Sequence, residues 1–102
     1  MNSNLQGCRF YKAYLVNTDF SGADLRGAAL DDTSMDGASL KGAIAAGAYF
    51  SESLLDVGTL ENADFTDASI PRKTLPQVCE RSDVKGTNPV TGVDTAESLM
   101  CP

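Results

Sequence analysis

The side chains that could do chemistry in this chain are its three cysteines and 14 acidic residues, because it has no histidine. Histidine is the commonest general base and metal ligand, so most hydrolytic and zinc mechanisms lose their usual participant. The serines, threonines and lysines are scattered without a neighbouring base, and no glycine-rich loop opens a helix. The residue types therefore predict a protein that is not an enzyme and carries no cofactor.

Size and charge narrow the function classes further. The 102 residues suit one domain, and the net charge of −6 argues against binding to a nucleic-acid backbone. The sequence contains no run of about 18 apolar residues, so it predicts no membrane insertion. It also contains no charged segment followed by an apolar one, so it predicts no secretory signal.

A five-residue repeat organises most of the chain. Thirteen of the 14 positions reached by steps of five from residue 5 are large and apolar, and the residue two places before each is small. The large positions are Leu5, Phe10, Leu15, Phe20, Leu25, Leu30, Met35, Leu40, Ala45, Phe50, Leu55, Leu60, Phe65 and Ile70. Two places after them, glycine recurs six times.

A period of five fits neither a helix nor a single strand. On a helix, the apolar stripe would rotate by about 140° per repeat, and along a strand an odd period would alternate faces. The chain must therefore turn a corner once per repeat and wind into an all-β solenoid with its small and large residues inside.

The repeat units resemble those of the pentapeptide repeat family. Residues 23–27 (ADLRG), 38–42 (ASLKG) and 63–67 (ADFTD) are similar to its A-(D/N)-L-x-x unit, and the resemblance covers about residues 3–72. It implies a right-handed quadrilateral β-helix with four repeats per coil, hence about 3.5 coils. We expect residues 1–72 to form this β-helix and residues 73–102 to close it. Since little precedes Leu5, we expect a truncated or processed form in which Met1 was added.

Stacking every 20 residues would place acidic side chains above one another. Asp36 would lie beside Asp56, and Asp32 beside Glu52, which could hold Ca²⁺ or form an acid/base pair. No flanking carbonyl or Asn-rich loop completes a coordination set, so we predict a solvated acidic face and no metal site.

The pattern stops at Pro71, and the remaining residues predict two short helices. Thr74 to Gln77 is typical of a capping box that opens a helix over residues 74–82, and Asp94 is expected to cap a second. A turn is predicted over residues 88–92. Leu75, Val78, Leu99 and Met100 would cover the last coil as an apolar lid.

The three cysteines fall in two environments. Cys8 replaces an inward alanine, which predicts a buried, inert thiol. Cys79 and Cys101 sit one in each expected helix, and their spacing allows either a disulfide or two free thiols.

The C-terminal segment carries a second, narrower resemblance. Residues 75–79 (LPQVC), 88–95 (NPVTGVDT) and 98–101 (SLMC) are similar to the C-terminal segment of thylakoid lumenal pentapeptide repeat proteins of plants and cyanobacteria. This resemblance implies a disulfide between Cys79 and Cys101, an oxidising compartment and location in the thylakoid lumen. The sequence would then be the mature portion, without its targeting peptide.

Outward apolar residues are the remaining candidate site. Tyr14, Val16, Leu54 and Val57 are expected on one face, where they would either pack along the rod or form a contact surface for an unknown protein partner. We therefore predict a non-enzymatic interaction or structural module. The alternative is a DNA mimic that binds a topoisomerase, which the modest charge, the short rod and five basic residues within the repeats disfavour.

Overall fold

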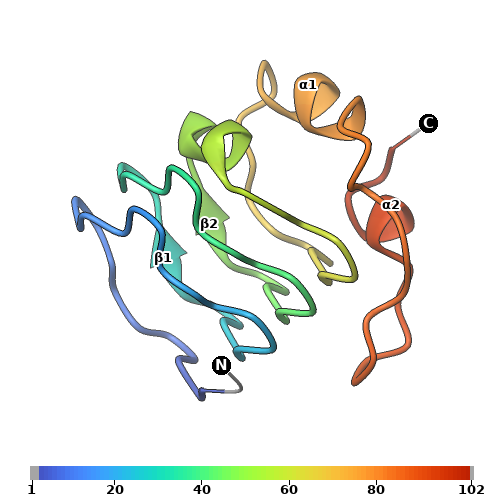
Figure 1. Cartoon of the computed structure of the whole chain (residues 1–102), viewed down its shortest axis with the longest axis horizontal. Helices are drawn as coiled ribbons and strands as arrows, with labels where there is room; N and C mark the ends of the chain where they lie inside the picture. Colours follow the sequence, from blue (N-terminus) through green and yellow to red (C-terminus); the bar gives the residue numbers. More distant parts are fainter. Residues whose placement is uncertain (1–2, 102) are drawn as a thin grey trace.

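Parallel bridges join residues that are 20 apart, which is the spacing predicted from four repeats per coil. Strand β1 (Ala29–Leu30) pairs with β2 (Tyr49–Phe50), with Ala29 opposite Tyr49. Single bridges with the same offset run from Asn4↔Asp24 to Tyr49↔Ser69. The computed structural model describes residues 3–101, and in them these contacts build a β-helix whose coils stack along one axis (Figure 1). The expectation about Met1 lies outside the described residues.

The interior holds the small and large residues of the repeat. The alanines at positions 23, 28, 38, 43, 48 and 63 are fully buried, as are Leu25, Leu30 and Leu40. Leu5, Phe10 and Leu15 of the first coil are half-buried against this core. Each fully buried Leu contributes about 1.5–3 kcal/mol relative to an exposed one, so the buried leucines supply much of the folding free energy.

Each corner depends on a positive φ two residues after the large position. Six of these corner residues are glycines, from Gly7 to Gly47. The other corners with positive φ carry Lys12, Asn17, Asp32, Asn62 and Asp67. Such a φ at the third residue of a four-residue turn is typical of a type II turn, which lets the chain change direction within two residues.

In six repeats, a polar residue before the large position closes the corner from outside. Asp19, Asp24 and Asp64 each accept a hydrogen bond, through a carboxylate oxygen, from the backbone N–H two residues later, at 2.9–3.2 Å. Asn4, Ser39 and Thr59 do the same at 3.2–3.4 Å. Short polar side chains favour this local bond, which explains why the repeat carries Asp or Asn there.

The regular coil breaks at residues 51–57, which corrects one prediction. A 3-10 helix, η1 (Glu52–Asp56), replaces two corners, and Leu54 and Val57 are buried in the core rather than exposed on a face. Val57 occupies a position that has positive φ in most of the other repeats, but it has a φ of −64°. A β-branched side chain is strongly disfavoured at positive φ, so the chain follows another path and Leu54 rather than Leu55 fills the interior.

Two short helices follow the coils. Helix α1 (Leu75–Cys79) is shorter than predicted, and Thr74 makes no capping bond because it is itself helical; the turn closes on the Pro71 carbonyl instead. Helix α2 (Thr95–Ser98) begins as predicted, with Asp94 accepting from the Glu97 N–H. Gly92 N–H bonds to the Asn88 carbonyl in the predicted turn. Neither helix within residues 3–101 has the length and apolar character to cross a membrane.

Exchanging residues at two exposed corners should change stability in opposite directions. Asp32→Gly removes a left-handed non-glycine residue and should raise the free energy of unfolding by about 1 kcal/mol. Gly27→Ala should lower it by about 1 kcal/mol although a methyl group meets nothing within 4 Å there. Urea titrations measure both changes. Asp36→Gly is the control: its φ is not positive, so glycine should destabilise there, and a gain would contradict the corner argument.

Candidate functional site

Arg81 ties the C-terminal segment to η1. Its guanidinium donates hydrogen bonds to the carbonyls of Leu55 at 3.1 Å, Val57 at 2.9 Å and Gly58 at 3.3 Å. At this turn the Gly58 N–H bonds to the Ala38 carbonyl at 2.7 Å, whereas the corresponding N–H of a regular repeat bonds to the large residue three places earlier, which here is Leu55. A guanidinium presents several donors in a fixed plane, so one side chain can satisfy the whole turn.

Asp83 completes this site from the other side. Its carboxylate pairs with Arg81 at 2.8 Å and accepts the backbone N–H of Leu60 at 3.0 Å. Burial would raise the pKa of Asp83, but the hydrogen bonds from Arg81 and Leu60 outweigh it and hold that pKa below its usual value. The ionised carboxylate is therefore part of the folded contact.

The C-terminal segment supplies the acceptors that a further coil would supply. In the regular coils, the N–H of each large residue bonds to a carbonyl 19 residues later, as from Leu40 to Thr59 at 3.0 Å. In the last coil, the N–H groups of Leu60, Asn62 and Phe65 bond instead to the Asp83 carboxylate, the Lys85 carbonyl and the Ser98 hydroxyl. Three edge donors that no coil covers are thus satisfied.

Asn88 holds the intervening loop against two coils. Its buried amide nitrogen donates to the carbonyls of Gly42, Ala43 and Asn62, each at 3.1 Å. Its amide oxygen accepts the N–H groups of Val90 and Thr91 at 2.9 and 3.0 Å. A single side chain therefore fixes both the turn and its position on the β-helix.

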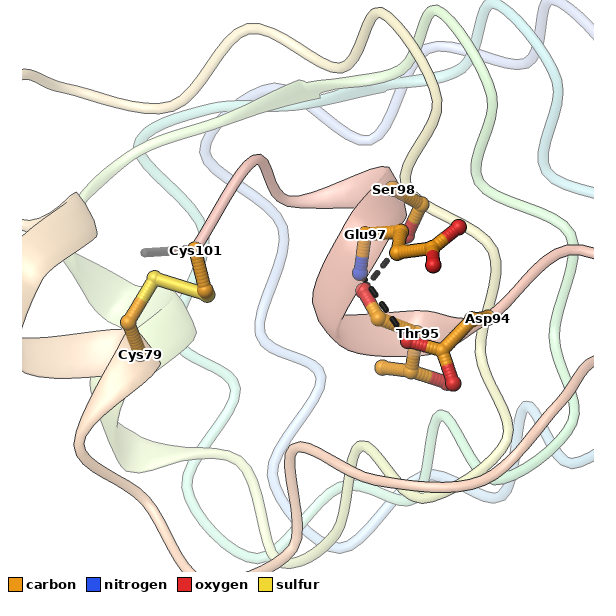
Figure 2. Close-up of a disulfide and its surroundings, with 6 residues drawn as sticks. All are labelled: Cys79, Asp94, Thr95, Glu97, Ser98 and Cys101. Carbon is orange, nitrogen blue, oxygen red and sulfur yellow. Dashed lines mark hydrogen bonds between the residues drawn. A yellow bond between two sulfur atoms is a disulfide. The ribbon is translucent and has the colours of Figure 1, made fainter.

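Cys79 and Cys101 form a disulfide, as the resemblance of the segment implied. Figure 2 shows it beside α2, whose Asp94 cap and Ser98 hydroxyl are bonded within the helix. The bridge joins the end of α1 to the residue that follows Met100, so the two helices are held at a fixed separation. Cys8 is free and half-buried, rather than fully buried as predicted.

Two hollows open at this end of the molecule. The larger, of about 360 Å³, is lined by Leu75, Pro76, Cys79, Glu80, Met100 and Cys101. The smaller, of about 110 Å³, is lined by Phe65, Asp67, Ala68, Ile70, Leu75, Ser98, Leu99 and Met100. Val78 and Leu99 cover the last coil as predicted, but Met100 does not: its side chain is 85% exposed.

The predicted apolar patch is only partly present. Tyr14 is 80% exposed and Val16 is half-buried, but Leu54 and Val57 belong to the core for the reason given above. Tyr11, which sequence reasoning missed, is 55% exposed, and the Lys12 ammonium lies 5.2 Å from its ring centroid. We call Tyr11, Lys12 and Tyr14 the first-coil tyrosine surface.

Carboxylates on the outside of the coils serve local contacts. Asp24 accepts from Arg26 and Gln6, and the Arg26 bond holds the pKa of Asp24 far below its usual range. Burial would raise the pKa of Asp64, but bonds from Thr66 and Thr91 lower it overall. Among residues 3–101, no group of three or more potential ligands is placed to hold a metal ion.

Replacing Arg81 should weaken the contact between the C-terminal segment and η1. Arg81→Lys keeps the charge but loses the fork to three carbonyls, so the free energy of unfolding should fall by about 2–3 kcal/mol. The wild type should lose stability as pH falls below about 4 and the Asp83 carboxylate protonates, because a lowered folded pKa stabilises only above that range. The variant should lose less. Arg26→Lys, at an exposed ion pair, should change stability by less than about 1 kcal/mol.

Thiol counting tests the disulfide directly. Denatured protein should contain one reactive thiol, Cys8, without reductant and three after reduction. For two cysteines 22 residues apart, the chain-entropy account gives about 3 kcal/mol of stabilisation. In a Cys8→Ala background, reduction should lower the urea midpoint accordingly. Three thiols without reductant, or an unchanged midpoint, would contradict the bridge or its contribution.

The chain is similar to known proteins of one family. The chain is 24% identical to a pentapeptide repeat protein from the thylakoid lumen of Arabidopsis thaliana, with a TM-score of 0.48 over 99% of this chain and 90% of that one. No curated protein matches significantly. The family described as pentapeptide repeats matches residues 3–42 and 33–70, in 8 copies. Because these matches span about two thirds of the sequence, the chain belongs to the pentapeptide repeat family.

Proposed function

We propose that this chain is a non-enzymatic protein-interaction module whose rigid β-helix presents side chains to a protein partner at fixed spacing. The observation that carries the proposal is the first-coil tyrosine surface. Tyr11 and Tyr14 expose large rings three residues apart, on either side of the corner at Lys12 in one coil. Tyrosine is enriched in interface hot spots because it adds contact area at low cost in side-chain entropy.

The backbone supports such a role because it holds these rings in place. Phe10 N–H bonds to the Ala29 carbonyl at 2.8 Å, and Leu15 N–H bonds to the Ser34 carbonyl at 2.7 Å. Both bonds lie in the segment that carries the tyrosines, so the rings project from a coil pinned to its neighbour. A preorganised surface loses little entropy on binding.

The finer architecture is part of the proposal. Four positive-φ corners in each of the 20-residue intervals 7–26 and 27–46 support a right-handed quadrilateral coil, and the repeats allow about 3.5 coils. Residues 73–102 would act as a cap, which the bonds from Leu60, Asn62 and Phe65 to this segment support.

The thylakoid lumen is the compartment we propose. A structural disulfide requires an oxidising environment, and Cys79 and Cys101 form one. The resemblance of residues 75–101 to lumenal proteins of this family supports the same location.

Affinity capture from thylakoid lumen extract tests the proposal. Immobilised oxidised protein should retain a partner, and purified partner should bind it at least about tenfold more tightly than it binds the Tyr11→Ser/Tyr14→Ser variant. Tyr49→Ser is the matched control, because Tyr49 is 52% exposed but projects from β2 in another coil. The control should bind like the wild type.

Two outcomes would overturn this function. Equal binding by the double variant and the wild type would remove the first-coil tyrosine surface from the interaction. Retention of DNA gyrase together with inhibition of supercoiling would favour the DNA-mimic alternative. The Arg26–Asp24 ion pair neutralises one acidic position of the repeats, which weighs against that alternative.

A further inference from the structure

Met100 occupies a backbone position that normally belongs to glycine. It follows α2 with a φ of +58°, its N–H bonds to the Glu97 carbonyl, and the Cys101 N–H bonds to the Ala96 carbonyl. This pair of bonds is the Schellman arrangement, whose left-handed residue is usually Gly or Asn. An unbranched apolar residue is strained there, so its presence calls for a reason.

The exposed side chain forms a ridge between two apolar hollows. Met100 and Leu75 line both the larger and the smaller hollow. A surface with an apolar projection directly beside apolar depressions is self-complementary under a two-fold axis, because each copy supplies both the projection and the hollow that receives it.

The charged residues on either side of α1 suit the same arrangement. The bond from the Leu75 N–H to the Pro71 carbonyl extends helical spacing back to Lys73, so Lys73, Pro76 and Glu80 lie along one face at intervals of three and four residues. Lys73 and Glu80 are exposed, and neither takes part in an ion pair within residues 3–101. If two α1 helices cross antiparallel at Pro76, Lys73 of each copy faces Glu80 of the other.

We propose that a second copy of this chain docks here, forming a two-fold dimer in which each Met100 enters the larger hollow of the other copy and Lys73 pairs with Glu80 across the axis. The surface is at the opposite end of the β-helix from the first coil, so the proposal does not depend on the proposed function (Figure 1). It accounts for the strained residue: glycine would fit the backbone better but would leave the facing hollow unfilled.

The oligomeric state of the oxidised protein tests this dimer. Sedimentation equilibrium from about 1 µM to about 1 mM covers the affinities of small interfaces. Salt of about 0.15 M screens the net charge of the copies. A reversible dimer is expected. Met100→Gly should weaken it at least about tenfold while raising the urea midpoint of unfolding, because it relieves the left-handed strain. Loss of dimer in this variant therefore cannot arise from misfolding.

Charge reversal tests the orientation. Lys73→Glu and Glu80→Lys should each weaken the dimer about tenfold by placing like charges together, and the double variant should restore it. Tyr14→Ser, at the other end, should dimerise like the wild type. A chain that stays monomeric throughout the range, or a dimer that Met100→Gly and both charge reversals leave unchanged, would overturn the proposal.

Discussion

The positive φ that recurs at the corners is the constraint on which the rest of the structure depends. Only when the chain turns within two residues can residues 20 apart lie side by side and exchange backbone hydrogen bonds. Glycine takes the positive φ of six corners without strain. At six corners, the side chain of an Asp, Asn, Ser or Thr before the large residue accepts a hydrogen bond from the corner backbone. The small and large residues then point inward together. The composition of the repeats follows from this one requirement.

The break at η1 shows what happens when the requirement is not met. Val57 cannot take the corner conformation readily, and the chain uses a 3-10 turn that buries Leu54 and directs the Gly58 N–H to the Ala38 carbonyl instead of that of Leu55. Buried polar groups left unpaired cost about 1–3 kcal/mol each, so the turn needs another donor. Arg81 provides it from 23 to 26 residues away along the chain. The Arg81 hydrogen bonds thus compensate for the irregular turn at η1.

The end of the coil stack poses the same problem as the break. The last coil has N–H groups that point toward no further coil, and side chains and carbonyls of residues 83–98 accept three of them. The disulfide and Asn88 then fix the segment that carries these acceptors. The segment has few buried apolar side chains of its own, Val78 and Leu99 among them. Polar contacts and the disulfide therefore hold it in place instead of a large apolar core.

The repeat made most of the β-helix predictable, since each five-residue unit encodes its own corner, interior and outer face. The interior positions and the Asp94 cap follow from local patterns, and the resemblance to the pentapeptide repeat family implied the 20-residue offset. Prediction of the candidate site was poorer. Tyr14 was found because an outward aromatic is visible in the pattern, but Leu54 and Val57 were misplaced because a uniform register was carried through residues 51–57. The β-branched side chain of Val57, at a position that favours positive φ, was the sequence signal that could have predicted the break.

The sequence by itself determined the β-helix, because its information lies in contacts between residues within one repeat and at a constant offset. Its resemblance to lumenal relatives also implied the disulfide. Only the tertiary structure decided that Arg81 and Asp83 secure η1 and the last coil, that Asn88 reaches Gly42 and Ala43, and that Met100 projects outward. These contacts join residues 23 to 46 apart with no recurring spacing, or depend on how α2 ends. No local pattern encodes them.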